Sequence, residues 1–175
     1  MKRHHFTLTE LLTVIAIIAI LAGIGVPATV AGLRKAAKGE AKHDCGSIRL
    51  ALEQYMNTYG SFKKLGIAAT SETIEETSYS FYTFNTSAGD IMNALTGTKG
   101  TANPRGIKFL DKRPDAADSA WLDPWGNPYH VRLVLPGSDT VPWNGQKLNG
   151  RIFVYSDGLN TAASAYQDDI KSWSN

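Results

Sequence analysis

A long apolar run near the N-terminus dominates the hydropathy pattern of the chain. It extends over residues 11–33 without a charged side chain. A helix needs about 20 consecutive apolar residues to cross the hydrocarbon core of a bilayer, which is roughly 30 Å thick. The run therefore predicts a single membrane span. Lys2 and Arg3 precede it, and by the positive-inside tendency they predict a cytoplasmic N-terminus with the remaining chain on the far side of the membrane.

Beyond this run, apolar residues recur at steps of three and four as far as Tyr59, while charged residues occupy the opposite face. This pattern is typical of an amphipathic helix. We therefore expect one helix over residues 6–59, which contains the span, ends near Gly60 and packs its amphipathic half on its own head. Pro27 removes a backbone hydrogen bond inside this helix, so a kink or a local opening is expected there.

Residues 60–175 predict a globular head, which gives the chain an α+β fold class: a long N-terminal helix and a small antiparallel β-sheet. Short helices are expected after Ser71 and after Ser87, because serine caps the first turn of a helix well. Four segments are rich in β-branched and aromatic residues, and the last two predict an antiparallel pair joined by a surface loop. The four segments are residues 79–84, 107–110, 129–135 and 151–156.

Composition excludes several classes of function. The chain has 175 residues and a formal net charge of +2, which is too small and too scattered for a nucleic-acid surface, so no nucleic acid is expected as a partner. Cys45 is the single cysteine, so neither an intrachain disulfide nor a cysteine-rich zinc site can form. The sequence contains no motif of a serine hydrolase, a zinc protease, a P-loop or a dinucleotide site. We therefore expect no catalytic residue and no enzyme.

A carboxylate, Glu10, stands directly before the apolar run, in the segment FTLTELL. A charged residue inside a membrane helix costs about 2.5–3.5 kcal/mol at the helix centre and less near the interface, and it usually has a partner. Two interpretations follow from the residues alone. Glu10 is either an incidental acid at the edge of a plain anchor, or an acid that meets a specific cation.

This segment and the run after it resemble the N-terminus of type IV pilins and of the pseudopilins of type II secretion. In that family a prepilin peptidase cuts a short basic leader before an aromatic or similar residue, the new amine is methylated, and a glutamate stands fifth in the mature chain. The resemblance implies a leader over residues 1–5, cleavage between His5 and Phe6, and Glu10 as the family glutamate. Pro27 stands in the place of the family's helix-breaking proline. His5 departs from the pattern, since glycine usually precedes the cut.

The resemblance also implies how such a chain assembles. In pilin-like filaments the glutamate is thought to meet the N-terminal amine of a neighbouring subunit. Glu10 would then pair with the amine of Phe6 in another copy, as the N-terminal helices bundle into a homopolymer. Further implied partners are membrane lipid before assembly, a peptidase that also methylates, an inner-membrane assembly platform and minor pseudopilins.

The segment DPWGNPY predicts two nested turns, because Asp-Pro suits the start of a type I turn and glycine permits positive φ. Its tryptophan is expected to plug the head core, so the residues alone indicate a structural role. The longer segment DPWGNPYHVRLVLPG also resembles the signature of the major pseudopilin of type II secretion. The residues given this structural role are Asp123, Pro124, Trp125, Gly126, Asn127 and Pro128.

The C-terminal loop, residues 156–173, carries oxygen side chains. Calcium takes six to eight oxygen ligands from carboxylates, amides and carbonyls, so Asp157, Asn160, Asp168 and Asp169 permit a site. The alternative from the residues alone is that one of the last two aspartates only caps a final turn.

The resemblance favours calcium, because the major pseudopilins end in a similar loop that closes on DDI and a tryptophan and binds calcium there. Trp173 matches that tryptophan and is expected to be structural. Asn160 stands where the family usually has an aspartate, so one charged ligand becomes a neutral amide.

Three functions remain. The first is a structural subunit of a type II secretion pseudopilus, which is polymerised from the inner membrane to help export proteins. The second is a type IV pilus or competence pilin, and the third is a membrane-anchored binding head that never polymerises. The first implies a single-pass protein of the bacterial inner membrane with a periplasmic head, which is later assembled into a periplasmic filament.

Overall fold

The computed structural model describes residues 7–87, 89–111, 120–159 and 169–173, and for residues 24–28 it describes the backbone only. The chain divides into two compact units, residues 1–37 and residues 38–175, and each is described by itself.

The first unit contains the N-terminal part of α1, a helix that spans Leu8–Tyr59 and confirms the predicted long helix. The helix runs without interruption through Pro27. In the described part of this unit the large apolar side chains lie exposed on the helix, with exposed fractions between 44% and 80%. They are Leu8, Leu11, Leu12, Val14, Ile15, Ile17, Ile18, Ile20, Leu21, Val30 and Leu33.

The membrane span predicted at residues 11–33 is not found, because no helix in the described part of the chain is both long enough and apolar enough to cross a bilayer.

The second unit is built around a five-stranded antiparallel sheet with the strand order β1-β2-β3-β6-β7, so the predicted α+β class with an antiparallel sheet is confirmed. The predicted pairing of the two segments at 129–135 and 151–156 is also confirmed, since Val131 lies opposite Val154. The strands are β1 (Ala69–Ile74), β2 (Thr77–Asn85), β3 (His130–Val134), β6 (Ile152–Ser156) and β7 (Ile170–Lys171).

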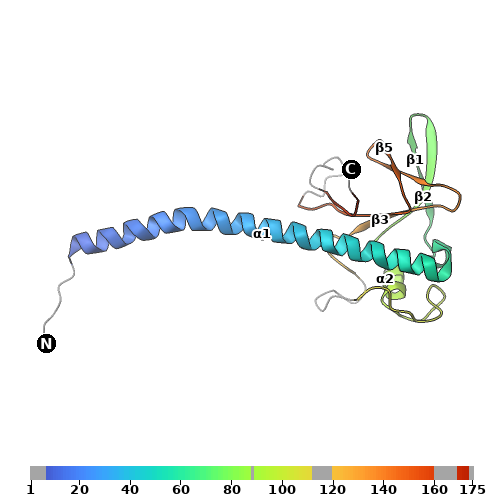
Figure 1. Ribbon diagram of the computed structural model, residues 1–175, viewed down its shortest axis with the longest axis horizontal. Helices are drawn as coiled ribbons and strands as arrows, with labels where there is room; N and C mark the ends of the chain where they lie inside the picture. The colour runs from blue at the N-terminus through green and yellow to red at the C-terminus, as the bar shows by residue number, and fades with distance from the viewer. Residues whose placement is uncertain (1–6, 88, 112–119, 160–168, 174–175) are drawn as a thin grey trace. The chain divides into compact units, whose positions relative to one another are not determined.

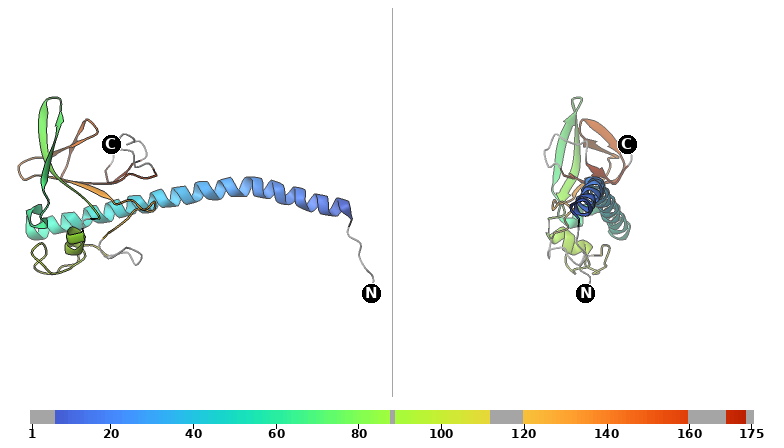
Figure 2. Two further views of the ribbon diagram at one scale, coloured as in Figure 1. Left: turned by 180° about the vertical axis from the view of Figure 1, so that it is seen from behind. Right: turned by 90° about the vertical axis from the view of Figure 1, so that its left-hand side faces the viewer.

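The C-terminal half of α1 lies between this sheet and the short helix α2 (Gly89–Leu95), as Figures 1 and 2 show. Its buried face was predicted by the apolar periodicity, and it forms the main core together with side chains of β3 and β6. The buried helix residues include Ala41, Cys45, Ile48, Leu52 and Tyr55.

Three local predictions are wrong. Residues 71–74 belong to β1, because pairing with β2 overrides the capping signal of Ser71. Residues 107–110 form no strand, since the amides of Phe109 and Leu110 both donate to the Leu95 carbonyl at the end of α2. The expected surface loop after β3 contains a hairpin of β4 (Thr140–Trp143) and β5 (Gln146–Asn149). Asn144 and Gly145, both at positive φ, form its turn.

The helix predicted after Ser87 is present as α2. A short 3-10 helix, η1 (Phe62–Leu65), follows α1, and Gly66 ends it at φ 69°.

The irregular segment over residues 96–111, which follows α2, is organised by one fully buried side chain, Asn103. Its amide nitrogen donates to the carbonyls of Ala94 and Ile107, at 2.7 and 2.8 Å. Its amide oxygen accepts from the Tyr59 hydroxyl and the Ile107 amide, at 2.6 and 3.1 Å. All four hydrogen-bonding positions of the amide are therefore used, and the segment is fixed to α1 and α2 without a strand ladder.

Candidate functional site

The N-terminus of α1 is closed by a capping box. Thr7 Oγ1 accepts from the Glu10 amide at 3.3 Å, and Glu10 Oε2 accepts from the Thr7 amide at 2.8 Å. The Thr7 hydroxyl also donates to Glu10 Oε2, at 2.7 Å. These bonds, the hydroxyl first and the amide second, lower the pKa of the exposed Glu10 carboxyl. Glu10 is therefore an ionised acid held in a defined position at the helix end.

His5 and Phe6, between which cleavage is predicted, lie outside the described residues, as does the Phe6 amine predicted to take part in assembly. The pairing of Glu10 with another copy's amine stays a prediction.

The DPWGNPY segment forms the two nested turns that its residues predict. Asp123 Oδ1 accepts from the amides of Trp125 and Asn127, at 3.0 and 2.8 Å, and the Gly126 amide donates to the Asp123 carbonyl at 3.0 Å. Gly126 has φ 89°, a conformation that glycine adopts at little cost. A bridge between Leu122 and Pro128 closes the segment.

Two side chains of this turn, Asp123 and Asn127, hold the start of the C-terminal loop. Asp123 Oδ2 accepts from the Ser156 hydroxyl at 2.7 Å, and Asn127 Nδ2 donates to the Gly158 carbonyl at 3.0 Å. Asp123 is buried and Trp125 packs partly buried against the main core. The turn is thus a clamp on the loop that follows β6.

Two of the four proposed calcium ligands, Asn160 and Asp168, lie outside the described residues. The other two stand at the base of the loop, where the register Ser156 opposite Ile170 brings Asp157 and Asp169 to facing ends of the β6–β7 pair. Asp157 Oδ2 lies 3.0 Å from His130 Nε2. Among the described residues, no group of three or more His, Cys, Asp or Glu side chains is arranged to hold a metal ion.

Trp173 is the last residue of the C-terminal loop, and it packs edge to face against Trp143 and Phe153, with ring centroids 5.2 and 5.4 Å apart. Its indole nitrogen is buried and has no hydrogen-bond partner. The geometry fits a structural role at the edge of the second core cluster, which contains Phe81, Val134, Val141 and Phe153.

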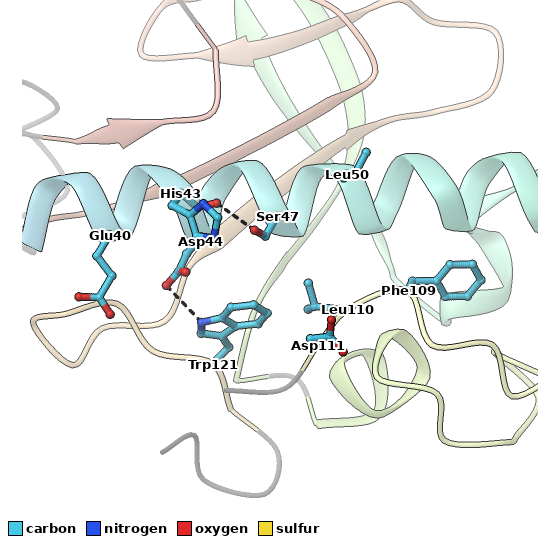
Figure 3. Close-up of a pocket in the computed structure, with 9 residues that line it drawn as sticks. All are labelled: Glu40, His43, Asp44, Ser47, Leu50, Phe109, Leu110, Asp111 and Trp121. Carbon is cyan, nitrogen blue, oxygen red and sulfur yellow. Dashed lines mark hydrogen bonds between the residues drawn. The ribbon is translucent and has the colours of Figure 1, made fainter. Parts of the chain in front are cut away.

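A second site was not foreseen. A cavity of about 510 Å³ lies within the second unit, between α1 on one side and residues 109–111 with Trp121 on the other (Figure 3). Three carboxylates line it, Glu40, Asp44 and Asp111, and its nine described lining residues include no lysine or arginine. Leu50, Phe109, Leu110 and Trp121 supply apolar wall. We name this cavity, with these seven residues, His43 and Ser47, the acidic pocket.

Asp44 fixes the inner wall of the acidic pocket. Its side chain is only 4% exposed, and Oδ2 accepts from the Tyr129 hydroxyl at 2.7 Å and from Trp121 Nε1 at 3.3 Å. Burial, followed by the bond to Asp44, raises the pKa of Tyr129, so the phenol stays a donor. The sequence held one signal of this arrangement, because Asp44 interrupts the apolar face between Ala41 and Ile48.

Comparison with known proteins gives one informative similarity. The chain is 26% identical over 175 residues to type II secretion system core protein G of Aeromonas hydrophila, and the match covers 98% of this chain and 93% of that protein. No family model matches the chain. No solved structure matches it either. The similarity supports the relationship to type II secretion proteins that the N-terminal motif predicts, and a structural protein rather than an enzyme.

Proposed function

We propose that the chain is a structural subunit of a type II secretion pseudopilus, polymerised from the inner membrane to help export proteins. The observation that carries this proposal is the similarity to core protein G along nearly the whole of both chains. A match of this extent includes the N-terminal helix as well as the head. The match therefore favours the interpretation that both proteins use the N-terminal helix and the head in the same way.

The exposed apolar side chains of the first unit support assembly through the N-terminal helices. Burial of apolar surface contributes about 25 cal/mol per Å², and monomeric proteins rarely leave a contiguous apolar surface of this kind uncovered. The exposed positions run from Leu8 to Leu33. In the proposed filament the equivalent helices of other copies cover them, and before assembly membrane lipid does so.

Glu10 acts in this proposal as the acid that meets the amine of Phe6 in a neighbouring copy. Thr7 holds one oxygen of the carboxylate, Oε2, by two hydrogen bonds, so its position is set before assembly. The amine becomes available once a prepilin peptidase cuts between His5 and Phe6 and methylates the new terminus. An inner-membrane assembly platform and minor pseudopilins complete the proposed partners.

Calcium binding at the C-terminal loop is part of the proposal. The carboxylates of Asp157 and Asp169, brought to the base of the loop by the β6–β7 pair, have the oxygen chemistry that calcium prefers. Asn160 and Asp168 would complete the side-chain ligands. The bound ion would join the two ends of the loop.

The proposed function is tested by assembly of the full chain in a bacterium that carries a type II secretion apparatus. We expect short fibres in sheared or detergent-extracted envelope fractions, seen by electron microscopy, whose subunit begins at Phe6 by intact mass. Glu10→Val should abolish the fibres, whereas Thr13→Val, a matched change on the same helix, should not. A chain that stays monomeric, or fibres whose subunit still begins at Met1, would contradict the proposal. Long fibres that project from cells would instead favour a surface pilus.

A further inference from the structure

A small cavity of the second unit lies where the end of α1, η1 and two strands of the sheet meet. Its volume is about 100 Å³, which corresponds to about three water molecules, so the cavity suits the end of one side chain. Ser61, Ser138 and Arg151 contribute the polar groups of its lining. We name this cavity the arginine pocket. Its apolar side chains are those of Met56, Phe62, Tyr82, Val134, Leu135 and Pro136.

Arg151 supplies the charge of the arginine pocket, and the described part of its own chain gives it no acid. The side chain is exposed, and none of the ion pairs or side-chain hydrogen bonds among the described residues includes its guanidinium. Asp139, which directly follows the lining residue Ser138, accepts instead from the Thr140 hydroxyl at 3.1 Å. The pocket therefore presents an unpaired cation beside an apolar wall.

This combination fits a carboxylate on an aliphatic stem. A guanidinium presents its N–H donors in a planar fork that matches the two oxygens of a carboxylate. The apolar wall can cover the methylene groups that lead to such a carboxylate. A glutamate side chain has both parts, so it is the group that the arginine pocket is best suited to receive.

One exposed glutamate of the second unit is free to enter such a pocket. Glu75 and Glu76 form the turn between β1 and β2. Glu75 accepts from Lys147 Nζ at 3.1 Å, and the Lys147 ammonium lies over the Tyr79 ring. Glu76 is exposed, and no hydrogen bond or ion pair among the described residues includes its carboxylate. The turn is thus anchored through Glu75 and presents Glu76 outward.

The backbone of this turn is strained. Glu75 and Glu76 have positive φ, 49° and 64°, which asparagine and glycine adopt more readily than glutamate. A strained residue at an exposed position is destabilising for the chain that carries it, and it points to a function outside folding. A contact with another molecule gives Glu76 such a function.

Glu76 cannot reach the arginine pocket of its own copy. Six steps along the extended strand separate Glu76 from Tyr82, which is about 20 Å at 3.3 Å per residue. Figures 1 and 2 show the β1–β2 hairpin extending away from the end of α1. The two complementary groups therefore belong to different surfaces of the second unit.

We propose that the arginine pocket of one copy receives Glu76 of a second copy of this chain. The Glu76 carboxylate pairs with the Arg151 guanidinium, and its methylene groups pack on the apolar wall. An interface between two different surfaces of one chain leaves one unused surface of each kind at the ends, so it propagates as an open helical array. This inference rests on the proposed filament and names the surfaces through which neighbouring heads meet.

A charge exchange in the full chain tests the proposal. Arg151→Glu alone and Glu76→Arg alone each place like charges opposite each other, so each should lose fibres at least about tenfold. The double variant, with both changes in one chain, should restore the fibres, because each pocket again meets the opposite charge. Lys99→Glu, a change at an exposed lysine outside both surfaces, is the control and should assemble normally.

Each outcome separates this contact from the filament. Fibres that are unchanged in both single variants would overturn the contact and leave the filament intact. Loss only with Arg151→Glu would mean that the pocket receives another acidic group, which also overturns the contact. Failure of the double variant to restore fibres, with a thermal midpoint equal to that of the wild-type chain, would do the same. Absence of fibres in the wild-type chain would overturn the filament itself.

Glu76→Gly separates assembly from folding. Glycine takes positive φ without strain, so the thermal midpoint of this variant should equal or exceed that of the wild-type chain, while its fibres should decrease. Glu75→Gly is the matched change at the other turn position and should keep the fibres. An equal decrease in both variants would mean that the shape of the turn matters and the Glu76 carboxylate does not, which overturns the proposal.

A disulfide measurement locates the contact directly. A chain with both Glu76→Cys and Arg151→Cys should form a ladder of covalent multimers when assembled fibres are oxidised, because each copy then links to two neighbours. Glu76→Cys with Lys99→Cys is the control. A ladder no more abundant than in this control would overturn the proposal.

Discussion

The Tyr129 hydroxyl donates a 2.7 Å hydrogen bond to Asp44 Oδ2, and this bond joins the residue directly before β3 to the buried face of α1. Both side chains are almost completely buried, at 0% and 4% exposed. A buried carboxylate is tolerated only when donors satisfy it, so the stability of the second unit depends on this pair.

Removing the Tyr129 hydroxyl tests this dependence. Tyr129→Phe should lower the free energy of unfolding of the full chain by about 1–3 kcal/mol, because Asp44 loses a buried donor. Chemical denaturation measures the change. Tyr82→Phe, which keeps the ring of a half-buried tyrosine, should shift stability by less than about 0.5 kcal/mol. Equal losses of unfolding free energy in both variants would show that the hydrogen bond to Asp44 does not stabilise the chain.

Alkaline pH should destabilise the chain through Tyr55. Burial raises the pKa of Tyr55 to about 12, and its hydroxyl donates to the Ala102 carbonyl at 2.6 Å. In the unfolded chain a tyrosine ionises near pH 10, so between pH 10 and 12 the folded state keeps a proton that the unfolded state has lost. Stability is complete below pH 10 and falls as the pH rises to 12. Denaturation midpoints measured across this range should fall less steeply for Tyr55→Phe.

Cys45 should resist alkylation in the native protein. Burial, followed by the charges of Asp44 and Asp123, raises the pKa of the Cys45 thiol to about 12, and only the thiolate reacts. Iodoacetamide at pH 8 should leave the folded chain unmodified by mass spectrometry and modify it fully in denaturant. Gly46→Cys places a second thiol at the next residue, which is exposed. Iodoacetamide should label this thiol readily without denaturant.

The capping box predicts a measurable effect on Glu10. Thr7→Ala removes the hydroxyl that donates to Oε2, so the pKa of Glu10 should rise toward its ordinary value, and the helix end should lose about 0.5–2 kcal/mol. Because the pKa of Glu10 is lowered in the folded chain, its ionised carboxylate stabilises the helix end at pH values above the ordinary glutamate pKa. This stabilisation is lost as the pH falls through the lowered pKa. A carbon-detected NMR titration of Glu10 in detergent micelles measures this. Thr13→Ala, whose hydroxyl bonds to the Thr9 carbonyl, should leave the titration unchanged.

Calcium should stabilise the native head if the C-terminal loop binds it. A ligand of the folded state present at 100 times its Kd adds about 2.7 kcal/mol. The thermal midpoint of the full chain in detergent should therefore rise with calcium and fall back with a chelator, whereas Asp157→Ala should respond to neither. A thermal midpoint of the wild-type chain that does not change with calcium would contradict the proposed site. An equal rise with magnesium would show that the site is not selective for calcium.

The elements whose apolar residues repeat with the period of a helix or of a strand could be predicted from the sequence. Ile48, Leu52 and Tyr55 lie on the face that the three-and-four spacing marks, and Val131 and Leu133 lie on the buried face of an alternating strand. β1 could not be predicted, because almost all of its side chains are exposed or half-buried and pairing with β2 alone specifies it. A polar strand of this kind leaves no hydrophobic pattern.

The acidic pocket could not be predicted for a different reason. Trp121 and Asp44 are 77 residues apart in the sequence, and only the tertiary fold brings their side chains into contact. The apolar periodicity predicts a helix that includes residue 44, yet nothing in the local sequence says which residue the Asp44 side chain contacts. The nested turns at Asp123 could be predicted, since they depend on five consecutive residues. Their hydrogen bonds to Ser156 and Gly158, more than 30 residues away, could not.

Asn103 stands at a position that resists deamidation. Asparagine deteriorates when the backbone nitrogen of the next residue attacks the side-chain amide, a ring closure that requires an N–H. Here the next residue is Pro104, whose nitrogen carries no hydrogen. The side chain that holds the irregular segment to α1 and α2 is thus protected from conversion to an aspartate, which would bury a charge and remove two donors. Asn144 and Asn149, each exposed and each followed by a glycine, have no such protection, and deamidation of the folded protein should begin at these two residues.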